Sequence, residues 1–311
     1  MKALVTGGAG FIGSNIVSLL VKKEHTVTVL DNLSSGYRWN LNPFPQIRLI
    51  EEDIRDPAAV QLAMTGVDVV FHLAASVGNK RSIEDPIEDS EINIIGTLRI
   101  LESARQAGVQ KIIFSSSAGI FGELKTLPIR EDHPVEPNSP YGASKLGAEK
   151  LCLAYAKLYK LECISLRYFN VYGINQRYDA YGNVIPIFAY RLLQGIPLVI
   201  YGDGEQTRDF VNAADVAQAN YQAALAKGIS GAFNIASGTR VTIRYLAELM
   251  SEVSGIRTTI EHDPARPGDV RHSLADISAA QKAFRFDPTV PLKEGLRKYM
   301  DWARDELKMR G

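Results

Sequence analysis

Short apolar runs and longer amphipathic segments alternate along the first half of the chain. Runs rich in β-branched residues predict strands at 2–7, 26–31, 47–53, 67–75, 111–117 and 162–173. Between them, residues 10–24 and 92–108 place apolar side chains at helical spacing. Strands that alternate with helices form right-handed βαβ units around a parallel sheet, and the ligand binds at the carboxyl ends of the strands. The pattern therefore predicts a doubly wound α/β fold.

After about Gly173 this alternation loosens, and loops rich in Gly, Pro, Asp and Arg separate the apolar segments. No repeat, low-complexity tract or flexible linker divides the chain, so we expect a second region to pack against the sheet. We predict a Rossmann-type domain over 1–170, joined by 212–240. A smaller C-terminal α/β substrate-binding region would comprise 171–211 and 241–311.

A glycine-rich segment, "VTGGAGFIGSNIV", links the first predicted strand to the first predicted helix. Gly7, Gly10 and Gly13 stand three residues apart, with Phe11 and Ile12 between the last two. Glycines let the backbone turn tightly and approach a pyrophosphate, whose charge is met by free N–H groups at the helix N-terminus. Because the strand and the helix are both in place, this segment predicts a dinucleotide site.

An acidic residue ends the second predicted strand. Asp31, followed by Asn32, stands in the place where such a site binds the adenosine ribose. A carboxylate there accepts hydrogen bonds from the ribose diol and repels a 2′-phosphate, so NAD is favoured over NADP. The alternative interpretation is an ordinary turn after a strand.

The composition indicates no other kind of partner. Lys plus Arg and Asp plus Glu each number 35, so the net charge is zero and no overall field attracts nucleic acid or acidic membranes. The two cysteines fit no metal spacing and the five histidines include no closely spaced pair, so we expect no metal site. The N-terminus lacks a signal-peptide pattern and no apolar run reaches ~18 residues, so we expect a cytoplasmic protein.

A tyrosine and a lysine stand one helical turn apart in "SPYGASKLGAEKL". Tyr141 and Lys145 therefore share a helix face. Together with the glycine segment and the "FSSS" of a strand end, this pair resembles the extended short-chain dehydrogenase/reductase family, and most closely its nucleotide-sugar epimerases. The resemblance covers nearly the whole chain, because "RYFNVYG", "YGDGEQTRDFV" and "RPGDVRHSLAD" stand in that family's order and spacing.

The resemblance implies further contacts with NAD. Asp53 and Ile54 would border the adenine, although Asp53 alone could be an acid at a strand end. The other expected contacts run along the dinucleotide to the nicotinamide: Leu73, Ala74 and Ala75, then Asn93, then Ser115, Tyr141, Lys145 and Tyr168.

The same resemblance implies a reaction at the nicotinamide end. A free tyrosine has a pKa near ~10, so a phenolate at pH 7 needs a shift of about three units. The Lys145 ammonium and a positive nicotinamide would lower this pKa together. We expect Tyr141 to remove the proton from a sugar hydroxyl while NAD takes the hydride, and Ser117 to hold the sugar oxygen. The alternative is a surface Tyr and Lys beside a polar strand end.

The residues after Ser117 restrict this chemistry. In the related dehydratases and decarboxylases a Glu stands shortly beyond the catalytic Ser or Thr, whereas "AGI" follows here and moves no proton. Elimination has no catalyst, so the expected reaction is epimerisation of a UDP-hexose at C4 through a transient 4-keto sugar. Gly119 departs from the family's usual Thr, Ser or Ala, and we expect it to open space over the sugar.

The second half of the chain carries residues that match the family's nucleotide-sugar contacts. They are Arg208 and Arg266 for the diphosphate, Asn170 for a phosphate, Asp269 for the ribose, and Asn183 and Val184 for the base. Any single arginine of this kind could instead be a solvated surface charge. Their positions in the family's motifs favour the binding role.

Ser273 stands where the family varies between bulky Tyr and small Ser or Cys. A small residue there leaves room for a 2-acetamido group, so we expect N-acetylhexosamine substrates beside UDP-glucose and UDP-galactose. The alternative is a serine without influence on the substrate.

Two other functions remain open. A UDP-glucuronate 4-epimerase would use the same Ser, Tyr and Lys, and a non-catalytic NAD-binding regulator would lack part of the catalytic set that is present here. The resemblance also implies a homodimer in which helices near 86–107 and 141–160 pair across a two-fold axis. An apolar stripe on the first helix could equally belong to the core: Ile92, Ile95, Leu98 and Leu101.

Overall fold

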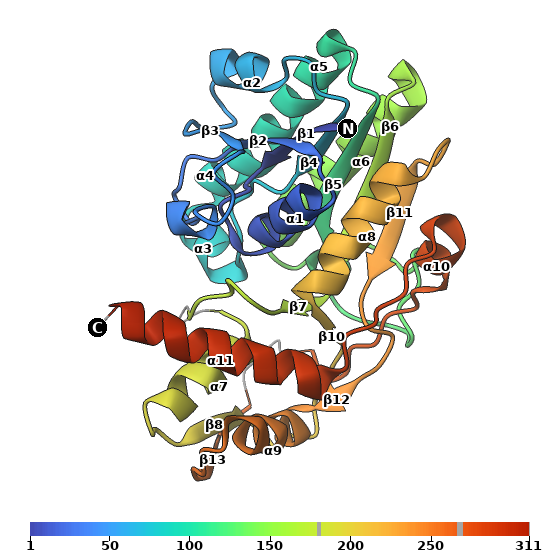
Figure 1. Cartoon of the computed structure of the whole chain (residues 1–311). Helices are drawn as coiled ribbons and strands as arrows, with labels where there is room; N and C mark the ends of the chain where they lie inside the picture. Colours follow the sequence, from blue (N-terminus) through green and yellow to red (C-terminus); the bar gives the residue numbers. More distant parts are fainter. Residues whose placement is uncertain (179–181, 266–269, 311) are drawn as a thin grey trace.

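The computed structural model describes residues 1–178, 182–265 and 270–310, and its first half alternates strands and helices (Figure 1). The strands of the main sheet are β1 (Lys2–Thr6), β2 (Thr26–Leu30), β3 (Arg48–Ile50), β4 (Val69–His72), β5 (Lys111–Ser117), β6 (Glu162–Tyr168) and β11 (Gly231–Ile235). The helices beside them are α1 (Phe11–Lys22), α2 (Pro57–Ala63), α3 (Asn79–Glu84), α4 (Pro86–Ser90), α5 (Thr97–Ala107), α6 (Pro140–Tyr159), α8 (Ala213–Leu225) and α10 (Ser278–Phe284).

The main sheet is parallel throughout, with the order β11-β6-β5-β4-β1-β2-β3. β1 pairs with both β2 and β4, so the strand order reverses at β1. In a doubly wound sheet this reversal leaves a crevice at the carboxyl ends of the strands, where ligands bind. The predicted Rossmann-type fold is confirmed.

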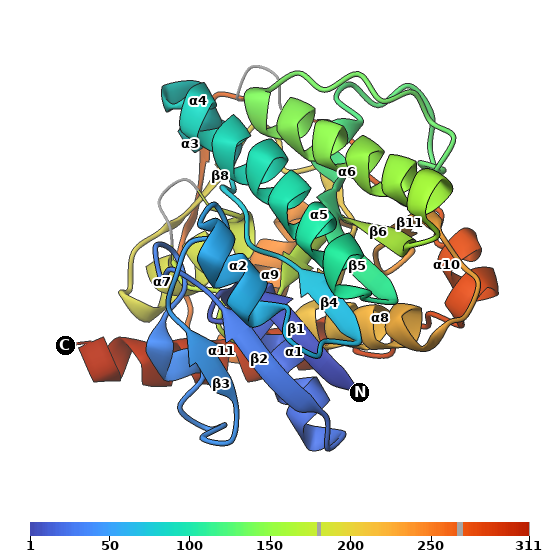
Figure 2. The same cartoon turned by 90° about the horizontal axis from the view of Figure 1, so that it is seen from above.

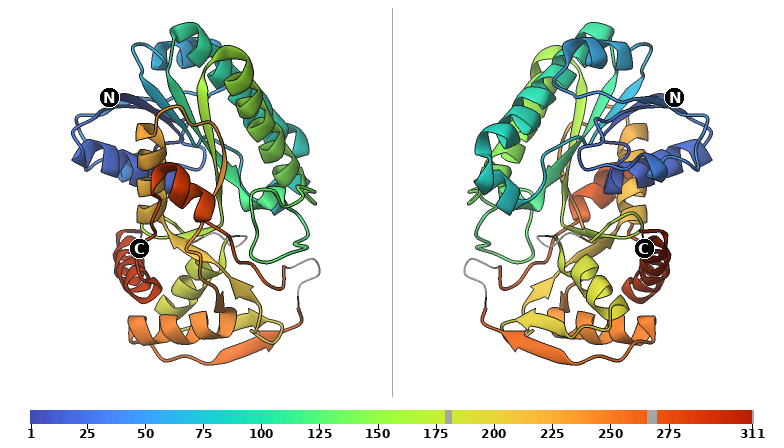
Figure 3. Two further views of the ribbon diagram at one scale, coloured as in Figure 1. Left: turned by 90° about the vertical axis from the view of Figure 1, so that its right-hand side faces the viewer. Right: turned by 90° about the vertical axis from the view of Figure 1, so that its left-hand side faces the viewer.

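Helices cover both faces of the sheet (Figure 2). α1 and α8 lie on one face and α2, α5 and α6 on the other (Figure 3). Neighbouring residues of one strand pack into the hydrophobic clusters on opposite faces of the sheet. Val5 and Ile113 belong to the first cluster, whereas Leu4 and Ile112 belong to the second. Successive side chains of a strand point to opposite faces of the sheet, and helices cover both faces here. These strands are therefore apolar on both sides, and their sequences do not alternate between apolar and polar residues.

The smaller region lies beyond the carboxyl ends of the strands (Figure 1). Its elements are β7 (Asn170–Tyr172), α7 (Val184–Leu193), β8 (Leu198–Tyr201), β9 (Thr207–Arg208), β10 (Phe210–Asn212), β12 (Val241–Thr242), α9 (Ile243–Ser254), β13 (Ile260–Asp263) and α11 (Leu292–Arg310). Its strands pair as β7 with β10, β8 with β13 and β9 with β12. A third hydrophobic cluster fills the space between α7, α9 and α11. None of the described helices is long and apolar enough to cross a membrane.

Two elements differ from the sequence pattern. The single strand expected over 162–173 breaks at Phe169, because β6 pairs with β11 in the main sheet whereas β7 pairs with β10. The helix expected over 92–108 begins as a π-helix, Glu91–Gly96, before α5 continues it. Gly96 packs directly on Ile54, whose side chain would lie 2.5 Å from a Cβ at that position.

Candidate active site

A cavity of about 1400 Å³ opens at the carboxyl ends of the central strands, and residues of both regions line it. Most of the predicted site residues are among its lining residues: Gly7, Gly10, Phe11, Ile12, Gly13, Asp31, Asn32, Asp53, Ile54, Leu73, Ala74, Ala75, Ser115, Ser117, Tyr141, Lys145, Tyr168, Asn170, Asn183, Arg208 and Ser273. Two predicted residues, Asn93 and Val184, do not line it. Arg266 and Asp269 lie outside the described residues.

The glycine segment forms a tight cradle at one end of the cavity. Gly7 has a φ of +69°, and a Cβ there would lie 2.6 Å from the backbone nitrogen of Ala74. A Cβ on Gly13 would lie 2.1 Å from the carbonyl oxygen of Gly7. Gly10 is the N-cap residue of α1, and no side chain accepts a hydrogen bond from the first turn of this helix. The N–H groups of that turn therefore remain available for a ligand. This cradle fits a pyrophosphate.

Asp31 lies at the end of β2 and is only 7% exposed. Its carboxylate accepts hydrogen bonds from the N–H groups of Ala9 and Leu33, each at 2.9 Å. Burial raises the pKa of Asp31, and these backbone donors act in the opposite direction. A carboxylate has about four acceptor sites, so two remain for the hydroxyls of a ribose.

Asp53 lies beyond β3, in the loop that borders the cavity. Its carboxylate pairs with Arg55 at 2.9 Å and accepts from the amide of Asn32 at 2.9 Å. The Arg55 hydrogen bond is the main reason why the pKa of Asp53 lies below its ordinary value. Asp53 therefore ties together the two loops that would flank an adenosine.

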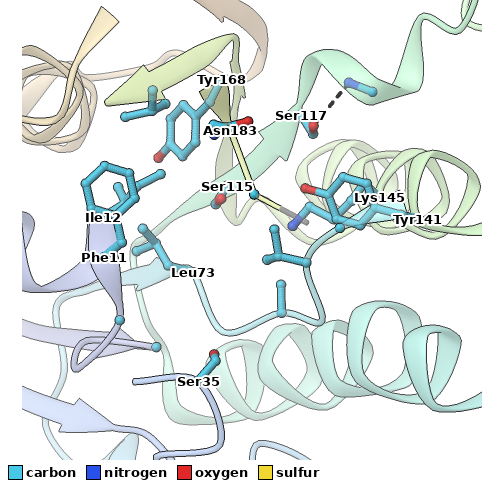
Figure 4. A pocket seen from close by; sticks show the side chains of 18 of the residues that line it. Phe11, Ile12, Ser35, Leu73, Ser115, Ser117, Tyr141, Lys145, Tyr168 and Asn183 are labelled. Carbon is cyan, nitrogen blue, oxygen red and sulfur yellow. Dashed lines mark hydrogen bonds between the residues drawn. The ribbon is translucent and has the colours of Figure 1, made fainter. Parts of the chain in front are cut away.

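Tyr141 and Lys145 come from the first two turns of α6. Ser139 caps this helix by accepting from the N–H of Gly142 at 3.1 Å, and Pro140 occupies the first turn. A Cβ on Gly142 would lie 2.5 Å from the carbonyl oxygen of Gly119, so the helix start packs directly on the turn after β5. This close packing brings Tyr141 beside Ser117 (Figure 4).

Ser117 ends β5, and its Oγ accepts a hydrogen bond from the N–H of Gly119 at 3.1 Å. Its own proton can then point toward Tyr141 or a sugar oxygen. A Cβ on Gly119 would lie 3.3 Å from Ser117 Oγ and 3.6 Å from the Tyr141 ring, so this glycine lies directly beside both side chains.

Burial shifts the pKa values of both Tyr141 and Lys145. It raises the pKa of Tyr141, while the hydrogen bond from Ser117 lowers it. It lowers the pKa of Lys145 to about 8, against the attraction of buried acidic groups. The Lys145 ammonium lies 4.4 Å from the centre of the Phe114 ring, which partly compensates its lost hydration.

A buried polar layer lies behind this helix, and sequence reasoning missed most of it. Asp89 of α4 accepts from the Ser144 hydroxyl at 2.5 Å and from the Asn93 amide at 3.2 Å. Asn93 also holds both polar backbone groups of Ser76. Asn93 is 1% exposed, and these hydrogen bonds support the cavity wall from behind. The four-residue spacing of Asp89 and Asn93 was the available signal.

Ser116, which had no predicted role, belongs to a buried ion pair. Its hydroxyl donates to Glu149 at 2.7 Å, and Glu149 binds Arg167 at 2.7 and 3.0 Å. Glu149 lies on α6 and Arg167 on β6. The pair therefore fixes α6 to β6, the strand next to β5.

Four of the predicted substrate residues line the cavity: Asn170, Asn183, Arg208 and Ser273. Asn170 donates its amide to the carbonyl of Asp209 at 3.2 Å, and Arg208 donates to the carbonyl of Thr207 at 2.9 Å. Ser273 is 5% exposed, and its backbone N–H donates to the carbonyl of Thr207. This hydrogen bond holds Ser273 in place. Val184 does not face this space and packs on the third hydrophobic cluster.

Tyr168 lines the cavity near the cofactor residues, and its hydroxyl and the Asn220 amide exchange hydrogen bonds of 2.8 to 3.0 Å. Three further polar residues that we did not predict also line the cavity: Asn175, Gln176 and Arg177. They stand in the loop after β7, separated from its end by two residues, and a polar run near a strand end was the available signal.

Comparison with known proteins gives a family. The model of the NAD dependent epimerase/dehydratase family matches residues 3–236. The UDP-glucose 4-epimerase of Mycolicibacterium smegmatis is 38% identical over 311 residues, which span 98% of this chain and 99% of that protein.

Two solved structures are similar to this chain over almost its whole length. UDP-glucose 4-epimerase from Thermotoga maritima, solved with UDP-glucose, has a TM-score of 0.93 and 39% identity over 99% of this chain and 100% of its own. UDP-N-acetylglucosamine 4-epimerase from Methanobrevibacter ruminantium, solved with UDP-N-acetylmuramic acid, has a TM-score of 0.94 and 38% identity over 98% of each chain.

Proposed function

Because the chain belongs to the NAD dependent epimerase/dehydratase family, we propose that it inverts the C4 hydroxyl of UDP-hexoses. The predicted family, the use of NAD and the isomerase class are confirmed. One observation carries the proposal: Ser117, Tyr141 and Lys145 line the same cavity as the glycine cradle. No proton-transferring side chain follows Ser117 in its turn, which favours inversion over elimination.

The residues present fit the cofactor. The cradle of Gly7 and Gly13 would hold the pyrophosphate, and Asp31 the adenosine ribose. When bound, NAD⁺ would accept a hydride from C4 and add positive charge beside Tyr141.

The chain's own residues would move the proton. Tyr141 as phenolate takes the proton from the C4 hydroxyl and, after the 4-keto sugar has rotated to present its opposite face, returns it to the same oxygen. Ser117 donates a hydrogen bond to the same oxygen, and Lys145 supplies the nearby positive charge. Since burial raises the pKa of Tyr141, this charge is needed to form the phenolate.

The proposed substrates include N-acetylated UDP-hexoses. Ser273, a small side chain, lines the cavity together with Asn170, Asn183 and Arg208. The relatives act on both kinds of sugar by name, with one named for UDP-glucose and another for UDP-N-acetylglucosamine. Arg266 and Asp269 remain proposed contacts from their motif positions. We further propose a cytoplasmic homodimer.

Product analysis tests this function. The protein is incubated separately with UDP-galactose, UDP-N-acetylglucosamine and UDP-glucuronate, without added reductant, and the products are separated and weighed by mass spectrometry. An isomer of unchanged mass is expected from the first two. Loss of water or carbon dioxide would overturn the proposal. An isomer formed from UDP-glucuronate alone would show that UDP-glucuronate, and not a UDP-hexose, is the substrate.

Tyr141→Phe tests the assigned base. Removal of one hydroxyl from a half-buried ring leaves the fold intact, so the variant should bind NAD normally. Turnover should fall by at least about 10²-fold, the usual contribution of a general base. Near-normal turnover would remove Tyr141 from this role.

A further inference from the structure

An ion pair with little solvent exposure connects the C-terminal helix to the segment that follows β7. Arg177 Nε lies 2.6 Å from Glu306 Oε1 of α11, and the two side chains are 7% and 9% exposed. The guanidinium also lies 4.0 Å from the ring centre of Tyr37, 5.3 Å from that of Trp39 and 5.8 Å from that of Trp302. A buried cation needs such partners, because a charge left unpaired in the interior is strongly destabilising.

The contacts of Arg177 continue to the glycine cradle. Its Nη2 donates to Asn40 Oδ1 at 2.9 Å, and Asn40 Nδ2 donates to the carbonyl of Ala9 at 2.7 Å. The N–H of Tyr37 also donates to this carbonyl, at 3.0 Å. Ala9 lies between two glycines of the cradle, and its own N–H is held by Asp31. Each polar backbone group of Ala9 is thus fixed.

Neighbouring residues strengthen this connection. We name residues 174–178 the bridge segment. Asn15 of α1 donates to the carbonyl of Ile174, and Asn175 donates to the hydroxyl of Ser14, each at 2.9 Å. On its other side the segment is held by α11, because Tyr299 donates to the carbonyl of Gln176 at 2.7 Å.

The bridge segment also reaches the substrate side. Asn175, Gln176, Arg177 and Tyr178 all line the main cavity, and Tyr178 stacks on Tyr190 of α7 at 4.1 Å between ring centres. One short segment therefore contacts the dinucleotide cradle, the C-terminal helix and the helix beside the substrate.

We propose that Arg177 and Glu306 are positioning residues for NAD. Glu306 fixes the guanidinium of Arg177, and Arg177 orients Asn40 so that its amide holds Ala9 in the conformation that the pyrophosphate requires. This inference rests on the proposed function only in that NAD occupies the cradle. A merely structural ion pair would affect stability but not the affinity for NAD.

Two variants separate these roles. Glu306→Gln leaves the Arg177 charge unpaired, so the midpoint of thermal unfolding and the affinity for NAD should both fall, the latter by about ten-fold. The double variant Arg177→Met with Glu306→Leu leaves no buried charge, so its midpoint should recover. Its affinity for NAD should stay about ten-fold weaker, since Asn40 has lost its donor.

Asn40→Asp tests the route without disturbing the ion pair. Its carboxylate still accepts from Arg177 but has no amide to donate to Ala9, so the affinity for NAD should again fall about ten-fold. Asp305→Asn is the matched control, because Asp305 lies next to Glu306 on α11 with its side chain 72% exposed. Its midpoint and NAD affinity should equal those of the unaltered protein.

Calorimetric NAD titration measures the affinity independently of turnover. Tryptophan fluorescence reports on the cluster itself, because the only two tryptophans of the chain are Trp39 and Trp302. Recovery of both stability and NAD affinity in the double variant would overturn the positioning role, as would unchanged affinity in Glu306→Gln. Absence of NAD binding in the unaltered protein would instead contradict the proposed function.

Discussion

At the residue scale, the charge of Lys145 depends on pH within an accessible range. Burial lowers its pKa from 10.5 to about 8. The unfolded chain therefore binds this proton more tightly than the folded chain between pH 8 and 10.5. Across this window the free energy of unfolding should rise with pH by about 3 kcal/mol through Lys145 alone.

Denaturant unfolding of Lys145→Met and of the unaltered protein at pH 7.5, 9 and 10 measures this contribution. The variant should lack the rise, and other titrating groups cancel in the difference. Lys150→Met is the control, since Lys150 is exposed on the same helix. Equal pH dependence in Lys145→Met and the unaltered protein would show that Lys145 is not desolvated as the structure indicates.

Ser273 is a second residue with a separable effect. Its small side chain is buried at the wall of the cavity, so Ser273→Tyr fills space that a 2-acetamido group would need. The kcat/KM for UDP-N-acetylglucosamine should fall at least about ten-fold relative to that for UDP-galactose. An unchanged ratio in competition assays would mean that Ser273 does not select the substrate.

At the scale of elements, the sequence predicted the strands and helices that carry the cradle and the pair Tyr141 and Lys145, because glycines and apolar periodicity are local signals. It did not predict the break at Phe169, since that depends on which strand pairs with β7. Nor did it predict the polar layer around Asp89, because hydrogen bonds between α4 and α6 join residues about 55 positions apart.

Gly13, in the first turn of α1, should tolerate no side chain. In Gly13→Ala the new Cβ would lie 2.1 Å from a backbone carbonyl that cannot rotate away. We expect a loss of about 2 kcal/mol in the free energy of unfolding and a marked loss of NAD affinity. Gly147→Ala is the matched control: its nearest neighbour would be Ile94 at 3.5 Å, so it should be neutral or stabilising. Equal effects of both substitutions on NAD titration would argue against the cradle.

At the scale of the whole molecule, three helices that contact one another, α3, α4 and α6, carry exposed apolar side chains. Ile83 of α3, Ile87 of α4 and Leu158 of α6 are 64%, 70% and 68% exposed. The apolar stripe that begins at Ile92 belongs partly to the core and partly to the surface, because Leu101 is buried whereas Ile95 is 45% exposed. These helices lie together along the face of the sheet that carries α5 and α6 (Figure 2), and such a surface is typical of a subunit interface.

The proposed homodimer makes this surface testable. In a two-fold interface each substitution occurs twice, so Ile87→Glu with Leu158→Glu places four carboxylates against apolar surface. The dissociation constant of the dimer should rise at least about 100-fold, as measured by sedimentation. Leu225→Glu, at a 54% exposed position at the end of α8, should leave it unchanged. If the double variant sediments as the unaltered protein does, the two-fold axis does not pass through α4 and α6, and the exposed isoleucines need another explanation.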